Sequence, residues 1–302
     1  MKKRILIKVS GGIGDFMIIL PAIKELSKTY YVDILSRAGS EQDFNGGILN
    51  EVLKYNPYVS KIIHHEDYIL YKKMFRRYDR VGLAYLYYLD QEQTLIKEKQ
   101  RYKYAAEQLG VYKLTTDHTD IDFFLQEDEI NNAKNILKKY KKTVIITPVQ
   151  LRKNEWLNEG KYIHKDKWDE IIKNCPNYTF VLLGSSSDCV SFDYPNVLNL
   201  IDKTSIRESI AILNVADYYI LPDGFLNHAA GGMNKTGISI FGISPPYIYG
   251  YECSTNLWYH PGCAPCGITD PNYMFMDRYC CMRYTGIPVK TEEVIQVMSE
   301  EL

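Results

Sequence analysis

A carboxylate follows a glycine-rich turn near the start of the chain. In the stretch KVSGGIGDFMIILPAIKEL, Gly12 and Gly14 lie between an apolar run and an amphipathic one, and Asp15 comes directly after them. Glycines between a strand and a helix let a ligand approach the backbone, and such turns usually hold phosphate. The spacing matches neither the dinucleotide fingerprint nor the Walker loop. Asp15 is therefore either a helix N-cap, which would contribute about 1 kcal/mol, or a carboxylate with another task.

A second candidate site lies between Asp217 and Pro246. This stretch has the pattern of strand, turn, helix and strand, and its turn carries Asp223 and Gly224 ahead of a helix with His228. The start of a helix at the carboxyl end of a strand favours an anion, by roughly 0.3 to 2 kcal/mol per charge. The other interpretation makes His228 a packed histidine and assigns the small residues after it to close helix-to-sheet packing.

A third candidate is Lys161, which precedes a helix that the pattern predicts to begin near Lys165 or Asp166. From such a loop its ammonium could reach a phosphate, although a loop lysine is more often solvated. The helix contributes three expected core residues, Trp168, Ile171 and Ile172.

Four of the seven cysteines crowd into nineteen residues in the last quarter of the chain. A C-x-x-C pair is followed by an adjacent pair, and four thiolates in tetrahedral geometry are the usual ligands of zinc or iron. Because adjacent cysteines fit one metal poorly, Cys253 could replace one of them. The alternatives are a structural zinc or iron and free or redox-variable thiols, whereas Cys175 and Cys189 are expected to pack in a core. The candidate metal ligands are Cys263, Cys266, Cys280 and Cys281.

Basic residues gather in the runs YKKMFRRYDR and KEKQRYKY. Such runs are usually solvated helix faces. If the protein binds a phosphorylated or acidic partner, cationic side chains in these runs would hold it, with arginine suited to bidentate contacts. The candidates are Arg76, Arg77, Lys99 and Arg101.

The elements that must position these residues alternate between strands and helices. Short runs rich in Val, Ile and Tyr are separated by helical patterns, which is typical of parallel sheets with helical crossovers. The rhythm weakens at the polar helix EDEINNAKNILKKYKK and restarts at Thr143. We therefore predict an α/β protein of two domains, 1–135 and 136–302, with a Cys-rich segment 253–282 in the second. The ligand would bind in the cleft between them, and the final helix, TEEVIQVMSEEL, could pack back on the first domain.

The composition of the 302-residue chain is typical of a soluble globular protein. The chain is 46% hydrophobic and 24% charged, and its formal net charge of -1 gives no reason to expect nucleic acid as a partner. The apolar run near the N-terminus is short and is broken by Lys8, so we interpret it as a buried strand and expect a cytoplasmic protein. No run reaches the roughly 20 apolar residues that span a bilayer.

Taken together, these segments resemble glycosyltransferase family 9, the ADP-heptose heptosyltransferases of bacterial surface polysaccharide assembly. The resemblance spans nearly the whole chain, and the order and spacing of its degenerate motifs carry it. It implies a GT-B fold, in which two Rossmann-like domains with parallel sheets face a central cleft, the first binding the acceptor and the second the nucleotide sugar. The segments that carry it are ILIKVSGGIGDFMIILPAIKEL, RRYDRVGLAY, KYIHKDKW and the stretch from Asn199 to Pro246.

The resemblance also implies roles for residues. Asp15 matches the family's candidate general base, Lys161 matches a lysine that contacts donor phosphates, and Asp223 with His228 matches the turn and helix that bind the diphosphate. The further donor-side candidates are Gly184, Gly224 and Phe225, and the acceptor-side candidates are Gly12, Gly14, Arg76, Arg77 and Arg101.

The chain departs from the family pattern at two places. Gly224-Phe225 follows Asp223 where the family usually has Thr-Gly, so a hydroxyl donor is missing, and Tyr162-Ile163 follows the lysine where the family has a Trp. The first departure motivates an alternative function, a GT-B-like protein that binds nucleotide sugars without catalysis. A nucleotide-sugar epimerase of the same fold is another alternative.

The function that the resemblance implies is inverting transfer of a sugar, expected to be heptose from ADP-heptose. The acceptor would be a glycan, a lipid-linked glycan or a protein in bacterial surface glycoconjugate synthesis, such as that of lipopolysaccharide. Transfer would require no cofactor, because a lysine and a helix dipole can stabilise the leaving diphosphate in place of Mg²⁺. Peripheral association with the inner face of the membrane is a further expectation, and the sequence leaves the oligomeric state open.

Overall fold

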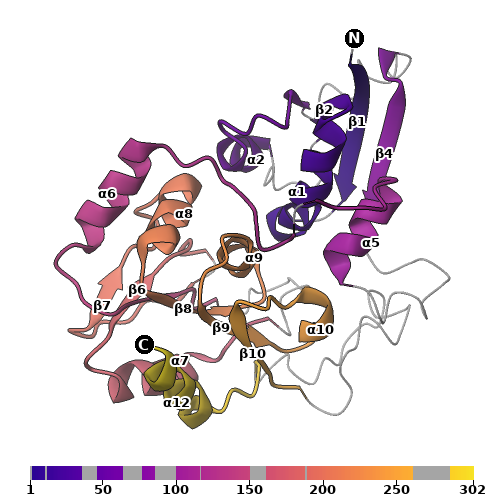
Figure 1. The fold of residues 1–302 in the computed structure, drawn as a ribbon. Helices are drawn as coiled ribbons and strands as arrows, with labels where there is room; N and C mark the ends of the chain where they lie inside the picture. The colour runs from indigo at the N-terminus through magenta and orange to yellow at the C-terminus, as the bar shows by residue number, and fades with distance from the viewer. Residues whose placement is uncertain are drawn as a thin grey trace. The chain divides into compact units, whose positions relative to one another are not determined.

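The computed structural model describes residues 2–10, 12–35, 46–63, 77–85, 100–115, 117–149, 161–187, 189–260 and 286–302. The chain divides into two compact units, residues 1–125 and 126–302 (Figure 1). Each unit contains one sheet in which every described strand pair is parallel. The predicted α/β class with two parallel sheets is therefore confirmed.

The first unit has a four-stranded sheet with the order β3-β2-β1-β4. Its strands are β1 (Lys3–Ser10), β2 (Tyr30–Leu35), β3 (Lys61–Ile63) and β4 (Arg80–Tyr85). Its described helices are α1 (Ile13–Ser27), α2 (Gly46–Val52) and α5 (Arg101–Gln108). Consecutive residues of β1, Ile5, Leu6 and Ile7, are all fully buried. Because neighbouring side chains of a strand point to opposite faces, both faces of this sheet are covered.

The second unit has a six-stranded sheet with the order β10-β9-β8-β5-β6-β7. Its strands are β5 (Thr143–Ile146), β6 (Thr179–Leu182), β7 (Val197–Asn199), β8 (Tyr218–Pro222), β9 (Gly237–Phe241) and β10 (Ser254–Trp258). Its described helices are α6 (Glu127–Leu137), α7 (Lys165–Asn174), α8 (Ile206–Val215), α9 (Phe225–Gly232), α10 (Pro246–Tyr249) and α12 (Thr291–Glu301).

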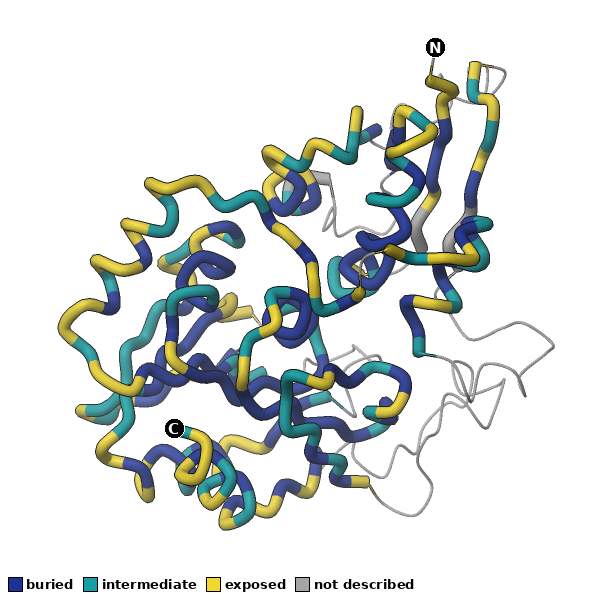
Figure 2. Tube along the Cα trace, viewed as in Figure 1, coloured by how far each residue is buried: buried dark blue, intermediate teal, exposed yellow. Residues whose placement is uncertain are grey.

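The core of the second unit lies along its central strands. β5, β8 and β9 are buried at every position, and Figure 2 shows β8 and β9 in dark blue. The predicted helix α7 begins at Lys165, and its predicted core residues Trp168, Ile171 and Ile172 are fully buried, as expected. Cys175 and Cys189 are also buried, which confirms their packing role.

Helix α6 belongs to the second unit. Its Glu129 receives two hydrogen bonds from Arg207 of α8, at 2.5 Å from Nε and 2.6 Å from Nη2. Figure 1 shows α6 and α8 side by side. The two units therefore divide between residues 125 and 126, whereas the domain boundary predicted at residue 135 falls within α6.

The final helix, α12, packs against α7 and β9 of its own unit. Val294 and Met298 are its fully buried apolar residues, and Glu301 near its end accepts a hydrogen bond from the Tyr218 hydroxyl at 2.6 Å. These contacts bury its apolar face within the second unit, and its packing on the first domain stays a prediction. Among the helices that the structure describes, none is both long enough and apolar enough to cross a membrane.

Candidate functional site

Both sheets have a topological switch point beside their central strand. In the second unit the chain runs from β5 outward to β6 and β7, and then returns to the other side of β5 at β8. In the first unit β1 lies in the same way between β2 and β4. Ligands of open α/β sheets bind outside the carboxyl ends of the strands at such points. Asp223 follows β8, and Asp15 lies in the helix that follows β1.

Asp223 is the buried centre of a charged cluster in the second unit. Its carboxylate lies 2.9 Å from Nζ of Lys161 and 3.4 Å from Nε2 of His228. The side chains of Asp223 and His228 are 2% and 6% exposed, whereas that of Lys161 is 34% exposed. Burial alone would raise the pKa of Asp223, but the Lys161 ammonium and His228 lower that pKa far below its ordinary value. The structure thus brings three sequence candidates together around one ionised carboxylate.

The residues after Lys161 fix its backbone. Tyr162 and Ile163 are buried, and the Tyr162 carbonyl accepts a hydrogen bond from the Ile287 N–H at 2.8 Å. Gly286 has a positive φ of 65° and lies against Tyr162, where a Cβ would come within 2.9 Å of the carbonyl oxygen. Two buried side chains thus follow Lys161 directly, while the Lys161 side chain is partly exposed.

Further polar groups lie at the same edge of the sheet. Helix α9 starts at Phe225, directly after Gly224, and the first turn of a helix leaves backbone N–H groups without intrahelical acceptors. Within the described residues, Asn227 Nδ2 and Thr147 Oγ1 are buried without a hydrogen-bond partner. Thr147 follows β5, which pairs in parallel with β8. The carboxyl ends of these two strands therefore lie at the same edge of the sheet. The arrangement is suited to a phosphate or another anion with several acceptor oxygens.

Within the described residues, Gly224 has no packing reason to be glycine. Its φ of 176° is ordinary extended backbone, and a Cβ there would meet, of the described atoms, only the Pro222 carbonyl oxygen at 3.8 Å. Gly184, in contrast, has a φ of 140°, and a Cβ would lie 2.5 Å from Sγ of Cys189. Gly184 is therefore accounted for by the backbone and its packing, whereas Gly224 leaves open space at the start of α9.

Asp15 has a local structural role in the first unit. It is the third residue of α1, and its Oδ2 accepts a hydrogen bond from the backbone N–H of Gly12 at 2.8 Å. The N-cap residue is Gly12, not Asp15, so the predicted cap is displaced by three residues. A carboxylate in the first turn is stabilised by the helix dipole. Asp15 is half-buried, and a Cβ on Gly12 would meet only Asp15 among the described atoms.

The other predicted site residues have diverse environments. Gly14 and Phe225 are half-buried in the first turns of α1 and α9, and Arg77 is exposed. Arg101 is only 2% exposed, with its guanidinium 5.5 Å from the ring centroid of Tyr104, so burial replaces the predicted solvated face. Some candidates lie outside the described residues: Arg76, Lys99, Cys263, Cys266, Cys280 and Cys281.

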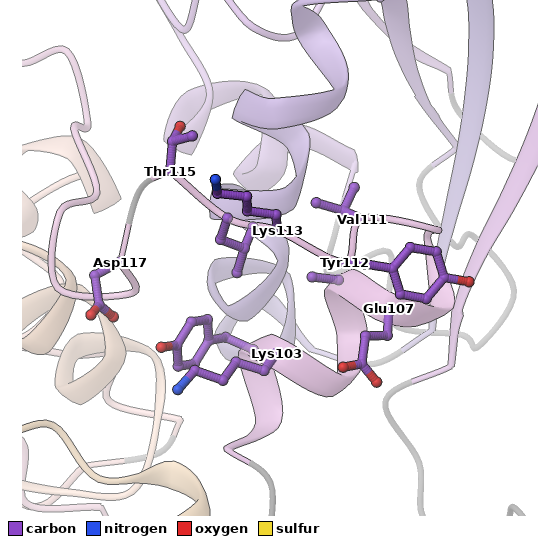
Figure 3. A pocket seen from close by; sticks show the side chains of 10 residues that line it. Lys103, Glu107, Val111, Tyr112, Lys113, Thr115 and Asp117 are labelled. Atoms are coloured by element: carbon purple, nitrogen blue, oxygen red, sulfur yellow. The ribbon is translucent and has the colours of Figure 1, made fainter.

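A pocket of about 540 Å³ with a mixed polar and apolar lining opens on the first unit, beside α5 (Figure 3). Tyr112 at its rim is 84% exposed, and Lys103 and Glu107 from α5 contribute opposite charges. Among the residues that the structure describes, no candidate from the sequence lines this pocket. Its lining residues are Tyr102, Lys103, Ala106, Glu107, Val111, Tyr112, Lys113, Leu114, Thr115 and Asp117.

Sequence reasoning missed Tyr251, whose hydroxyl lies 2.9 Å from Nδ1 of His228. It also missed Asn227, whose Oδ1 accepts a hydrogen bond from the Ser239 hydroxyl at 2.6 Å. Tyr251 lies outside every segment that carries the resemblance, and Asn227 lies within the stretch Asn199–Pro246 but was not singled out there. The one available signal for Tyr251 was the glycine at position 231, because a small residue in a helix often faces a large ring.

No family model matches the sequence. No curated protein matches it either. The structure, however, is similar to a glycosyl transferase family 9 structure from Veillonella parvula, with a TM-score of 0.66 and 12% identity over 99% of this chain and 96% of that chain.

Two structures from Escherichia coli are similar as well. Heptosyltransferase WaaC with ADP has a TM-score of 0.60 and 13% identity over 99% of this chain and 100% of that chain. The iron-containing dodecameric glycosyltransferase TibC, from an enterotoxigenic strain, has a TM-score of 0.64 and 14% identity over 99% of this chain and 77% of that chain. At these identities the likeness establishes the fold, and the predicted GT-B fold is confirmed.

Proposed function

We propose that the protein is an inverting glycosyltransferase that moves a sugar from a nucleotide diphosphate donor to an acceptor hydroxyl. The observation that carries the proposal is the buried Asp223 with Lys161 and His228, at the switch point of a parallel six-stranded sheet. This cluster combines a partly exposed cation with the start of a helix, which is the chemistry that a diphosphate requires.

The leaving group of the reaction is a nucleoside diphosphate, whose developing charge needs positive groups. The Lys161 ammonium carries three N–H donors, so it can keep its contact with Asp223 and still donate to a phosphate oxygen. The N–H groups and the dipole at the start of α9 would hold a second oxygen. Gly224 leaves the space in which the diphosphate would approach this backbone.

Asp15 is our candidate for the general base that takes the proton of the acceptor hydroxyl. Its hydrogen bond from Gly12 orients the carboxylate and occupies only part of its acceptor capacity. Asp15 lies in the first turn of α1, where a carboxylate interacts favourably with the helix dipole. Direct displacement of the diphosphate by one activated hydroxyl inverts the configuration at the anomeric carbon, because the nucleophile attacks opposite the leaving group.

We propose ADP-heptose as the donor, by analogy with structures of the same fold. WaaC was solved with ADP, and TibC was solved in complex with ADP-D-β-D-heptose. The acceptor would be a glycan, a lipid-linked glycan or a protein in bacterial surface glycoconjugate synthesis, including lipopolysaccharide. The protein would then work in the cytoplasm and associate peripherally with the inner face of the membrane.

The cysteine-rich segment would hold a structural zinc or iron that takes no part in transfer. Its four candidate ligands lie outside the described residues, so this proposal rests on residue type and spacing alone. Elemental analysis of the purified protein tests it. One equivalent of zinc or iron per chain is expected, and a metal-free, fully folded protein would contradict it.

Replacing Asp15 with Asn tests the proposed base. The amide oxygen can still accept the Gly12 hydrogen bond, so the fold and ADP binding should persist, while ADP release from ADP-heptose with a lipid-linked glycan acceptor should fall about 10²- to 10⁴-fold. Asp120, an exposed carboxylate of the same unit, supplies the matched control, and Asp120→Asn should release ADP at the wild-type rate. Undiminished release by Asp15→Asn would remove the base assignment.

A second candidate function is nucleotide-sugar binding without catalysis. Phe225 and Gly224 provide no hydroxyl after Asp223, and this is the feature that favours it. Tight ADP binding together with no ADP release from ADP-heptose, with or without acceptor, would support this candidate over the transferase.

A further inference from the structure

Tyr251 is a buried tyrosine whose hydroxyl contacts His228, the histidine of the charged cluster. Its hydroxyl lies 2.9 Å from Nδ1 of His228, and the two rings meet edge to face with centroids 5.8 Å apart. The other ring nitrogen, Nε2, lies 3.4 Å from Oδ1 of Asp223. His228 is therefore held between a phenol and a carboxylate.

The position of Tyr251 is fixed from two sides. Asn256 binds its main chain, with Nδ2 donating to the Tyr251 carbonyl at 2.8 Å and Oδ1 accepting from the Tyr251 N–H at 3.4 Å. Its ring fills the space over Gly231, where a Cβ would come within 2.2 Å of the ring. Tyr251 itself is only 4% exposed. Packing and main-chain hydrogen bonds thus hold the phenol of Tyr251 against His228.

The protonation of this chain of groups follows from their chemistry. Burial raises the pKa of Tyr251 well above its ordinary value, and the negative charge of Asp223 raises it further. The phenol therefore stays protonated and can donate. A neutral imidazole that accepts at one nitrogen carries its proton on the other.

We infer that Tyr251 is a positioning residue, whose hydroxyl donates to Nδ1 of His228 and so keeps the ring proton on Nε2, directed at Asp223. The histidine then adds one N–H donor to the carboxylate that also receives the Lys161 ammonium. Tyr251 acts on the cluster through His228 and without contact with a ligand. Its consequence for donor binding rests on the proposed function, whereas the tautomer of His228 does not.

The tautomer is tested by ¹⁵N NMR of the imidazole rings in the labelled full chain at about pH 8, above the ordinary pKa of histidine. The chain has six histidines, and the signals missing from the His228→Gln spectrum identify this one. We expect a protonated Nε2 and an unprotonated Nδ1 that accepts a hydrogen bond. A proton on Nδ1, or protons on both nitrogens, would overturn the inference, and this result needs no variant of Tyr251.

The role of the hydroxyl is tested by Tyr251→Phe, which keeps the ring over Gly231. In this variant the Nδ1 signal of His228 should move to the position of an imidazole nitrogen that accepts no hydrogen bond. The affinity for ADP should fall about fivefold, as for the loss of one neutral hydrogen bond. Tyr218→Phe is the matched control, because it removes the bond to Glu301 in the same unit and should leave the His228 signals unchanged.

Identical His228 signals in the wild type and in Tyr251→Phe would overturn the positioning role. Equal ADP affinity in these two proteins would overturn its consequence for the donor. Absence of ADP binding in every protein, the wild type included, would instead contradict the proposed function, and the NMR result would stand by itself.

Discussion

At the scale of single residues, the charges around Asp223 keep this buried carboxylate of the second unit ionised. A buried carboxylate stays ionised only when cations or N–H donors offset its loss of hydration. Here Lys161 and His228 supply that offset, and Lys161 retains access to solvent. The ion pair therefore offsets the lost hydration of the buried carboxylate and leaves the Lys161 ammonium partly exposed.

Asp223→Asn should lower stability by about 1–3 kcal/mol near neutral pH, because it removes the anion that Lys161 and His228 face. The pKa of Asp223 is lowered in the folded state, so its contribution is present above the unfolded-state pKa of about 4 and is lost as pH falls toward the folded-state value. Urea unfolding at several pH values should show the difference from wild type narrowing below about pH 4.

The exposed Asp193 provides the control for this measurement, and Asp193→Asn should differ little from wild type at any pH. A difference between Asp223→Asn and wild type that stayed constant down to about pH 3 would show that the carboxylate is not ionised through its partners.

Sequence reasoning identified the charged residues of the cluster and missed the side chains that orient them. Lys161, Asp223 and His228 belong to motifs, so the resemblance could name them. Tyr251 comes to His228 from 23 positions along the chain, and its role depends on packing that no local pattern encodes. The burial of Arg101 was missed for the same reason, because a charge run gives no sign of which member turns inward.

At the scale of elements, helix α9 combines an open start with a tightly packed middle. Among the described atoms, a Cβ at Gly224 would make only an ordinary van der Waals contact, whereas one at Gly231 would overlap the ring of Tyr251. Gly231 therefore permits the close approach of Tyr251, and we propose that Gly224, the N-cap residue, leaves space for a ligand.

Gly231→Ala and Gly224→Ala form a matched pair that tests this division. Gly231→Ala should destabilise the protein by about 1–3 kcal/mol because the methyl group overpacks a buried site. Gly224→Ala should change the free energy of unfolding by less than about 1 kcal/mol while weakening ADP binding, because its methyl group occupies the approach to the helix start. Urea unfolding and calorimetry with ADP measure both, and the reverse order of stabilities would contradict the packing account.

The elements themselves were largely predictable. Continuous apolar runs such as β8 and β9 indicate strands buried on both faces, and the start of α7 followed from its pattern. The N-terminal end of α1 was less predictable. Asp15 is a good capping residue in general, but here it bonds back to Gly12, and spacing alone does not distinguish the first position of a helix from the third.

At the scale of the whole molecule, the chain consists of two parallel-sheet units, each with its own switch point. The boundary between them was predicted at residue 135 and lies between residues 125 and 126. The amphipathic pattern of α6 indicates that one face of this helix packs against the protein. The ion-pair partner of its Glu129, however, is Arg207, which lies 78 positions further along the chain. A local pattern cannot indicate on which domain such a helix packs.

Arg207→Met tests the assignment of α6 to the second unit. The variant leaves Glu129 without its bidentate partner, so we expect a loss of about 1–3 kcal/mol and faster amide exchange in α6 and α8. Exchange in α1 of the first unit should not change. Lys203→Met, at an exposed position near α8, is the control. Faster exchange throughout α1, or unchanged exchange in α6, would contradict the assignment.

The central claim is that the cluster around Asp223 binds a nucleotide diphosphate, and titration calorimetry of the full chain tests it most directly. ADP, ADP-heptose and UDP-sugars are the ligands, Lys161→Ala is the test variant, and the exposed Lys203→Ala is its control. We predict that the wild type binds ADP and ADP-heptose and that Lys161→Ala binds them at least about tenfold more weakly, as for the loss of a charge-assisted hydrogen bond. Absence of binding to every nucleotide, or equal affinity in wild type and Lys161→Ala, would contradict the claim.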